Sequence, residues 1–117
     1  MTKPLPLRQG DVLLIPVRDI PANARELKRD TLGRIVLAYG EVTGHAHAIR
    51  NKGVCSFTTL DENEIEFLVV GAGGATLCHE LDSGAKAEHD DVVLPEGNYR
   101  LAVQCEYTPA ELQRVAD

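Results

Sequence analysis

Apolar runs separated by turn residues dominate the chain and predict a fold built mainly of β-strands. The clearest alternation comes late in the sequence, where Tyr99, Leu101 and Val103 share one face of a strand while Arg100 lies on the other. The earlier run Val12-Leu13-Leu14-Ile15 is apolar throughout, as is typical of a central strand covered on both faces. The predicted strands span residues 11–17, 34–39, 42–50, 54–59, 65–70, 75–79, 91–94 and 99–107.

Two segments differ from this pattern. Residues 18–33 combine Pro21, Asn23 and several charges without steady periodicity, which predicts a loop with one helical turn around residues 24–28. Near the end of the chain, Thr108 can cap a helix that has Pro109 at its first position and Glu111 at its third. We therefore expect a short C-terminal helix over residues 109–116.

The length of 117 residues is enough for one domain with one core, so residues 1–117 are expected to form a single β domain. Hydrophobic residues make up 44% of the chain and charged residues 26%, as in ordinary globular proteins. Many short strands with one terminal helix are typical of a small β-barrel or a two-sheet sandwich.

Charge and cysteine content restrict the classes of partner and compartment. The net charge of −6 argues against nonspecific binding to nucleic acid, which needs clustered Lys and Arg. The first residues do not resemble a secretory signal, and no apolar run has membrane-spanning length. Cys55, Cys78 and Cys105 are far apart and odd in number, so we expect reduced, buried thiols in a cytoplasmic protein.

The histidines carry the main indication of chemistry. In a strand over residues 42–50, His45, His47 and Ile49 share one face, and the small residues Ala46 and Ala48 occupy the other. Two imidazoles at this spacing have Cβ atoms roughly 6.5 Å apart, close enough to chelate one ion. The small opposite face would allow another element to approach closely.

A second pair, His79 and His89, is placed symmetrically about Gly84. An antiparallel hairpin that turns at residues 82–84 could bring them opposite each other, with Cβ atoms about 5 Å apart. This geometry depends on the register of the hairpin, which the long connection leaves open. If the fold brings this pair beside His45 and His47, three or four imidazoles could bind one ion.

The sequence thus predicts a divalent-metal site with His45, His47, His79 and His89 as ligands, and Glu41 and Glu80 as additional or supporting groups. Imidazole with carboxylate suits Zn²⁺, Fe²⁺, Mn²⁺ or Ni²⁺, and sequence does not choose among them. The hypothesis is a metal-binding β-barrel, with an enzymatic role on an unknown substrate left open. The alternative is a non-catalytic interaction or regulatory module whose histidines are structural or sense pH.

The stretch from Gly40 to His47, followed by Leu94-Pro95-Glu96-Gly97-Asn98-Tyr99, resembles the cupin pattern of a Gly, spacer and His-x-His motif with a later Pro-x-Gly motif. This resemblance implies a small β-barrel with a divalent metal inside, often dimeric. The chain departs from the pattern because no His follows Gly97 and the spacer before His45 is one residue short.

The chain also resembles a group of short uncharacterised bacterial and phage-type proteins. The similar segments are Gln9 to Leu13, Gly40 to His47 (extending into GEVTGHAHAI) and Glu106 to Pro109. This resemblance implies a stand-alone domain without indicating its chemistry. A homodimer formed through an exposed sheet edge is a further expectation, with the strand over residues 99–107 as the candidate edge.

Overall fold

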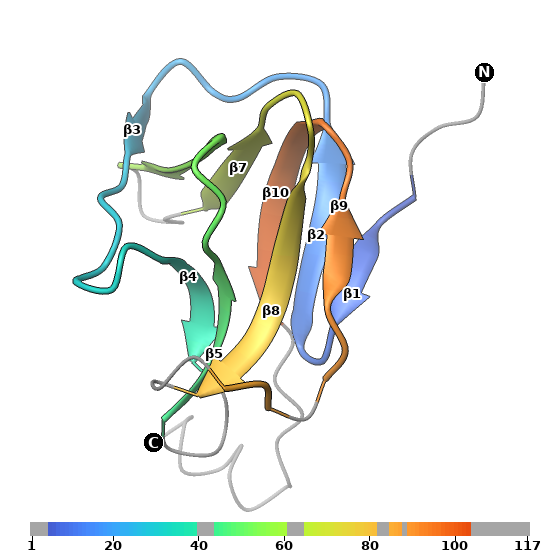
Figure 1. The fold of residues 1–117 in the computed structure, drawn as a ribbon. Coiled ribbons are helices and arrows are strands. Elements are labelled where there is room, and N and C mark those ends of the chain that lie inside the picture. The colour runs from blue at the N-terminus through green and yellow to red at the C-terminus, as the bar shows by residue number, and fades with distance from the viewer. Residues whose placement is uncertain (1–4, 40–43, 61–64, 82–84, 88, 104–117) are drawn as a thin grey trace, which may run out of the picture.

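The protein folds into two antiparallel β-sheets that lie face to face (Figure 1). The computed structural model describes residues 5–39, 44–60, 65–81, 85–87 and 89–103. Sheet A has the strand order β1-β2-β10-β7-β6-β3, and sheet B has the order β4-β5-β8-β9. The strands of sheet A are β1 (Leu7–Gln9), β2 (Val12–Val17), β3 (Ala24–Glu26), β6 (Val54–Thr59), β7 (Glu66–Val70) and β10 (Gly97–Val103). Those of sheet B are β4 (Ile35–Tyr39), β5 (His45–Ile49), β8 (Ala75–Leu81) and β9 (Val92–Leu94).

The prediction of a mainly β fold is confirmed, and the structure distinguishes between the two predicted architectures, a β-barrel and a two-sheet sandwich. The described residues form a two-sheet sandwich, and the two sheets do not close into a barrel. The predicted C-terminal helix over residues 109–116 lies outside the described residues. Within them, no helix has the length and apolar character needed to cross a membrane.

Most predicted strands are present with small shifts at their ends. Strand β8 continues to Leu81, two residues beyond the predicted end, because Glu80 and Leu81 pair with Ala46 and His45 of β5. Strand β10 begins at Gly97 because that residue already pairs with β7. The parts of the predicted strands that cover residues 42–43 and 104–107 lie outside the described residues.

Two expectations about the strands are wrong. The helical turn predicted around residues 24–28 is instead strand β3, since Ala24 to Glu26 pair with β6, a partner remote in sequence. The strand proposed as a dimerisation edge is internal, because β10 pairs with β2 on one side and β7 on the other. Asn98 to Arg100 pair with both neighbours, whereas Leu101 to Val103 pair with β2 alone.

The apolar core lies between the sheets. Each sheet contributes fully buried side chains, including Leu14 and Leu68 from sheet A and Ile49 and Leu77 from sheet B. Burying a side chain of this size contributes about 1.5–3 kcal/mol relative to exposure. The central position of β2 is confirmed, since it lies between β1 and β10 and buries Val12 and Leu14 completely.

Along the inward face of sheet B, the side chains change from aliphatic residues to histidines. On β8, Leu77 lies in the core, and the next residue on the same face is His79. On β5, Ile49 lies in the core, and the residues preceding it on that face are His47 and His45. Polar imidazoles therefore replace aliphatic side chains where β5 begins and β8 ends. The outward residues Ala46 and Ala48 are fully buried, as the small face predicted.

Candidate functional site

All four histidines of the chain meet at this end of sheet B. His47 and His79 are direct partners across β5 and β8, and their rings stack with centroids 4.5 Å apart and an interplanar angle of 12°. The ring of His89 lies 4.8 Å from that of His79 and 5.9 Å from that of His47. His45 meets the His79 ring edge-on, with centroids 5.4 Å apart. The ring of His79 thus contacts the other three.

The connection between β8 and β9 brings His89 into the cluster by a shift in register. Near the end of β8, the Ala87 amide donates to the His79 carbonyl, so Ala87 rather than His89 lies opposite His79. By Leu77 the partner is Val92, which requires extra residues on the β9 side. His89 lies in this extra stretch, and its backbone N–H donates to Nδ1 of His79 at 3.1 Å.

A buried glutamine from sheet A joins the cluster to the opposite sheet. Gln9 on β1 is 2% exposed, and its Oε1 lies 2.9 Å from Nδ1 of His47. Its Nε2 donates to the carbonyls of Leu77 and Asp90, both at 2.9 Å. One amide therefore binds β5, β8 and the segment that carries His89.

The turn after β1 lies directly against two of the rings. Gly10 has a φ of +55°, and a Cβ added there would lie 2.7 Å from Nε2 of His89 and 3.3 Å from Cε1 of His47. A side chain at this position would therefore occupy space that the imidazoles use. Asp11 follows in the same turn, and its negative charge acts on His47.

Burial and neighbouring charge keep His47 neutral. Its exposed fraction is 5%, and its pKa is lowered from 6.5 to about 4. The largest cause is desolvation, followed by repulsion from the charges that His79 and His89 would carry, while Asp11 acts in the opposite direction. At neutral pH, His47 therefore has a nitrogen lone pair available to a hydrogen-bond donor or a metal ion.

Glu80, predicted as a supporting carboxylate, is bound to arginines. Alternation along β8 places it on the face opposite to His79. Its Oε1 accepts from Arg34 at 3.2 Å and from Arg50 at 2.8 Å, and Arg34 also contacts Asp30 at 2.9 Å. Glu80 and Arg34 are almost fully buried, so this cluster links β8 to β4 and β5. Glu41, the other predicted carboxylate, lies outside the described residues.

The two cysteines that the structure describes, Cys55 and Cys78, lie on outward faces of their strands. Cys78 is partly buried on the outward face of β8, and its pKa is raised by burial and by the charges of Asp91 and Glu80. Cys55 is exposed, so the expectation that it would be buried is wrong. Alternation on β6 explains this, because Val54 and Ser56 take the inward positions. Cys105 lies outside the described residues.

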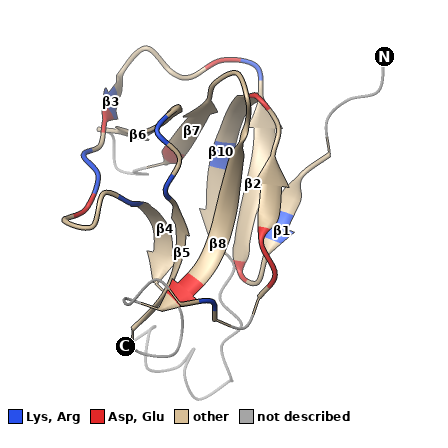
Figure 2. Cartoon of the chain, in the orientation of Figure 1, with Lys and Arg blue, Asp and Glu red and all other residues tan. Residues whose placement is uncertain are grey.

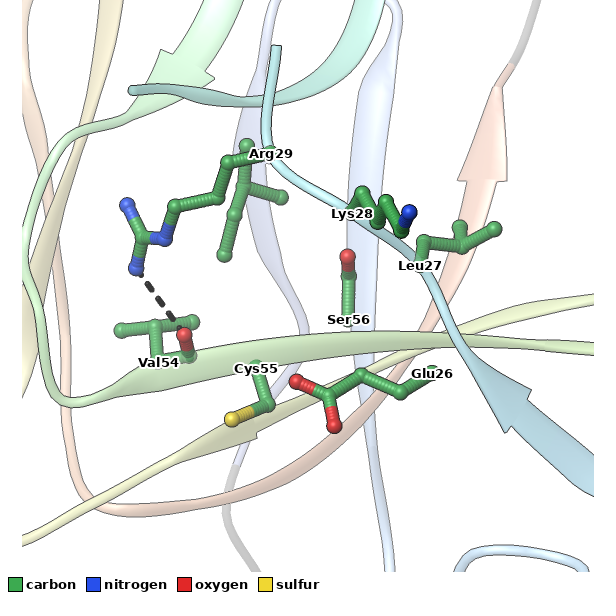
Figure 3. Close-up of a pocket in the computed structure, with 8 residues that line it drawn as sticks. Glu26, Leu27, Lys28, Arg29, Val54, Cys55 and Ser56 are labelled. Carbon is green, nitrogen blue, oxygen red and sulfur yellow. Dashed lines mark hydrogen bonds between the residues drawn. The ribbon is translucent and has the colours of Figure 1, made fainter.

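A second concave region has a volume of about 490 Å³ and contains none of the histidines. Figure 3 shows Arg29 beside it, donating to the Val54 carbonyl at 3.0 Å, with the Cys55 thiol and the Glu26 carboxylate nearby. Arg29 also donates to the carbonyls of Gly33 and Asn51. Its guanidinium is therefore largely used in fixing the loop to β6. The lining residues are Glu26, Leu27, Lys28, Arg29, Ile35, Val54, Cys55 and Ser56.

Basic segments gather around β3 and the loops next to β4 and β6, with acidic segments among them (Figure 2). Figure 2 shows acidic and basic positions on strands and loops of both sheets.

Comparison with known proteins gives the family. A family model described as a domain of unknown function (DUF8820) matches residues 8–104. The chain belongs to this family. The match covers every strand of both sheets except the first residue of β1. No match was found among curated proteins or among solved structures. The expected membership of an uncharacterised family is confirmed at this level, and the resemblance to cupins stays a prediction.

Proposed function

We propose that the histidine cluster of this DUF8820 domain binds a divalent transition-metal ion. The observation that carries the proposal is the meeting of His45, His47, His79 and His89, from two strands and a loop, with ring centroids 4.5–5.9 Å apart. Imidazole nitrogen is the commonest metal ligand among side chains that are neutral at physiological pH. The lowered pKa of His47 supports the proposal because ligation requires a neutral ring.

Hydrogen bonds around the rings also support it. Ligating histidines in proteins generally donate their second nitrogen to a carbonyl or carboxylate, which orients the ring. His47 has such a contact with Gln9, which is itself fixed by two backbone carbonyls. This arrangement holds His47 in one orientation and leaves its Nε2 for an ion.

The donor set favours borderline metals. Several nitrogen donors beside a carboxylate suit Zn²⁺, Fe²⁺ or Ni²⁺ better than Mg²⁺ or Ca²⁺, which prefer oxygen. Asp11 is the carboxylate whose charge acts on His47. An ion with an open coordination position could act as a Lewis acid or activate water.

Binding requires the rings to turn from their positions in the structure. Among the described residues, no group of three or more His, Cys, Asp or Glu is arranged to hold an ion. The near-parallel stack of His47 and His79 explains this, because a metal ion lies in the plane of a ligating ring and parallel planes do not converge on one point. His45 and His89 are only partly buried, so their side chains have room to rotate.

Metal analysis and thermal unfolding of protein purified without a histidine tag test the proposal. Zn²⁺ at a hundredfold excess over its Kd should stabilise the fold by about 2.7 kcal/mol. For a domain of this size, the shift in Tm is about 10 °C. The double substitution His45→Ala/His47→Ala should abolish the shift.

The matched control is Cys55→Ser, because an exposed thiol can bind Zn²⁺ outside the histidine cluster. This variant should behave like the wild type. Protein without bound metal, whose Tm is unchanged by Zn²⁺ and Ni²⁺, would contradict the proposal. The histidines would then be structural parts of a non-catalytic module.

A further inference from the structure

The hydrogen bonds of the cluster distinguish the four histidines from one another. Gln9 donates through Nε2 to two carbonyls, neither of which can donate in return. Its amide orientation is therefore fixed, and the atom facing His47 is the acceptor Oε1. It follows that Nδ1 of His47 carries the proton and that its lone pair is on Nε2.

The opposite assignment holds for His79. Its Nδ1 faces the backbone N–H of His89, which can only donate. Nδ1 of His79 must therefore hold the lone pair, and the ring proton is on Nε2. In this tautomer, neither nitrogen of His79 offers a lone pair to an ion while the hydrogen bond to His89 is kept.

The nitrogen that His89 presents lies beside His47. The space next to the Cα of Gly10 is bordered by Nε2 of His89 and by Cε1 of His47, at 2.7 Å and 3.3 Å from the Cβ that glycine lacks. Cε1 lies between the two nitrogens of the imidazole ring, and Nδ1 is held by Gln9, so Nε2 is the nitrogen of His47 that remains for an ion.

We propose that the ion is bound through Nε2 of His47 and Nε2 of His89, whose rings are neighbours, and that His79 is a positioning residue. His79 acts through its Nδ1, which accepts the hydrogen bond of the His89 backbone N–H and so positions His89. This inference rests on the proposed function and refines it, because His79 leaves the ligand set and His45 stays in it.

Long-range ¹H–¹⁵N spectra of the metal-free wild type test the nitrogen assignments directly. We expect a protonated Nδ1 in His47 and a protonated Nε2 in His79. Addition of Zn²⁺ should shift Nε2 of His47 and of His89 while Nε2 of His79 keeps its proton. A protonated Nδ1 in His79, or a Zn²⁺-dependent loss of its Nε2 proton, would overturn the inference.

Paired substitutions give a second measurement, by calorimetric titration with Zn²⁺. His79→Asn keeps an acceptor at the δ position and removes the ε nitrogen, so it should retain the wild-type affinity. His79→Gln lacks the δ acceptor and should lower affinity by about 10–100-fold, as loss of a supporting hydrogen bond does. His47→Asn is the matched control, and its Zn²⁺ affinity should fall further than that of His79→Gln because it removes the ligating nitrogen.

The outcomes separate the two proposals. Loss of Zn²⁺ binding in a folded His79→Asn variant contradicts the positioning role. If the variant does not fold, the wild-type spectra still decide. A wild-type protein that binds no Zn²⁺ contradicts the proposed function and the assignment of His47 and His89 as ligands. The positions of the ring protons on His47 and His79 are tested separately, by the spectra of the metal-free protein.

Discussion

Gln9 and His47, on opposite sheets, are joined by a hydrogen bond of 2.9 Å between Oε1 and Nδ1. Because the same amide also binds the Leu77 and Asp90 carbonyls, Gln9 sets the position of the histidine cluster relative to sheet A. This single side chain links the stability of the sandwich to the geometry of the proposed site.

Substituting Gln9 should therefore affect both properties. Gln9→Ala leaves buried polar groups on His47 and Leu77 without their partner, and each such group costs about 1–3 kcal/mol. We expect a lower free energy of unfolding in urea and a weaker Zn²⁺ affinity. Gln9→Glu is the control, since it keeps an oxygen facing His47 but loses the two donors. It should lose stability while keeping the Nδ1-protonated form of His47, and equal stability of Gln9→Ala and wild type would contradict the role of Gln9.

The stability of the metal-free protein should depend on pH through His47. Its pKa is about 4 in the folded state and near 6.5 when unfolded, so between these values the unfolded chain binds more protons. The free energy of unfolding should fall as the pH decreases from about 6.5 to 4, by an amount on the order of 3 kcal/mol. Urea unfolding in EDTA across this range measures the effect.

His47→Asn is the control for the pH experiment, because it removes the titrating group and keeps a small polar side chain. Its unfolding free energy should vary less over the same interval. An identical pH dependence in the two proteins would show that His47 is not the group responsible.

Gly10→Ala should disturb the histidines, and Gly33→Ala should not. Both glycines have positive φ, +55° and +78°, so either alanine should cost about 1–2 kcal/mol of backbone strain. Only at Gly10 does the new Cβ meet the rings, 2.7 Å from Nε2 of His89. At Gly33 nothing lies within 4 Å of it.

We expect similar losses in Tm from the strain in the two variants, with an additional loss for Gly10→Ala. Only Gly10→Ala should show altered histidine ¹H–¹⁵N signals and a lower Zn²⁺ affinity. If Gly33→Ala weakens Zn²⁺ binding equally, the effect comes from general destabilisation rather than from contact with His89.

Glu80→Gln should destabilise the fold without affecting metal binding directly. The carboxylate is 4% exposed and receives hydrogen bonds from Arg34 and Arg50, so removing its charge leaves a buried guanidinium with less compensation. Breaking a buried ion pair costs about 3–5 kcal/mol. Lys86→Gln removes an exposed pair with Asp90 and should cost at most about 1 kcal/mol.

Zn²⁺ affinity distinguishes this structural role from ligation. Measured at a temperature where Glu80→Gln remains folded, the affinity should match that of the wild type. A large loss would instead show that Glu80 belongs to the ion site, as the sequence had suggested.

Local patterns were sufficient to predict the strands and the histidine-bearing face. Alternation over residues 45–49 placed His45 and His47 with Ile49, and the structure has all three on the inward face of β5. Continuous apolar runs predicted β2 and β7 because their side chains are dictated by burial. The short strands β1 and β3 were missed, because three residues carry too little periodicity and their formation depends on pairing with β2 and β6.

The groups around the histidines depend on contacts that local patterns do not encode. Gln9 stands between Arg8 and Gly10, so the local pattern gives no sign that its side chain is buried between the sheets. The place of His89 depends on the register shift between the Ala87 and Val92 pairings, which symmetry about Gly84 could not reveal. The arginines that contact Glu80 come from the residue before β4 and the residue after β5, and their approach follows from the order of strands in sheet B.

The hydrogen bonds of Gln9 affect the order in which the histidine cluster is assembled during folding. Three of the histidines lie in strands of sheet B and His89 lies in the β8–β9 connection, whereas the amide that orients His47 comes from the edge strand of sheet A. A folding intermediate with sheet B formed and sheet A undocked would contain every imidazole but would lack the anchor that aligns them. If the proposed site is correct, tight ion binding would therefore appear only after β1 has packed against sheet B, in the last step of folding.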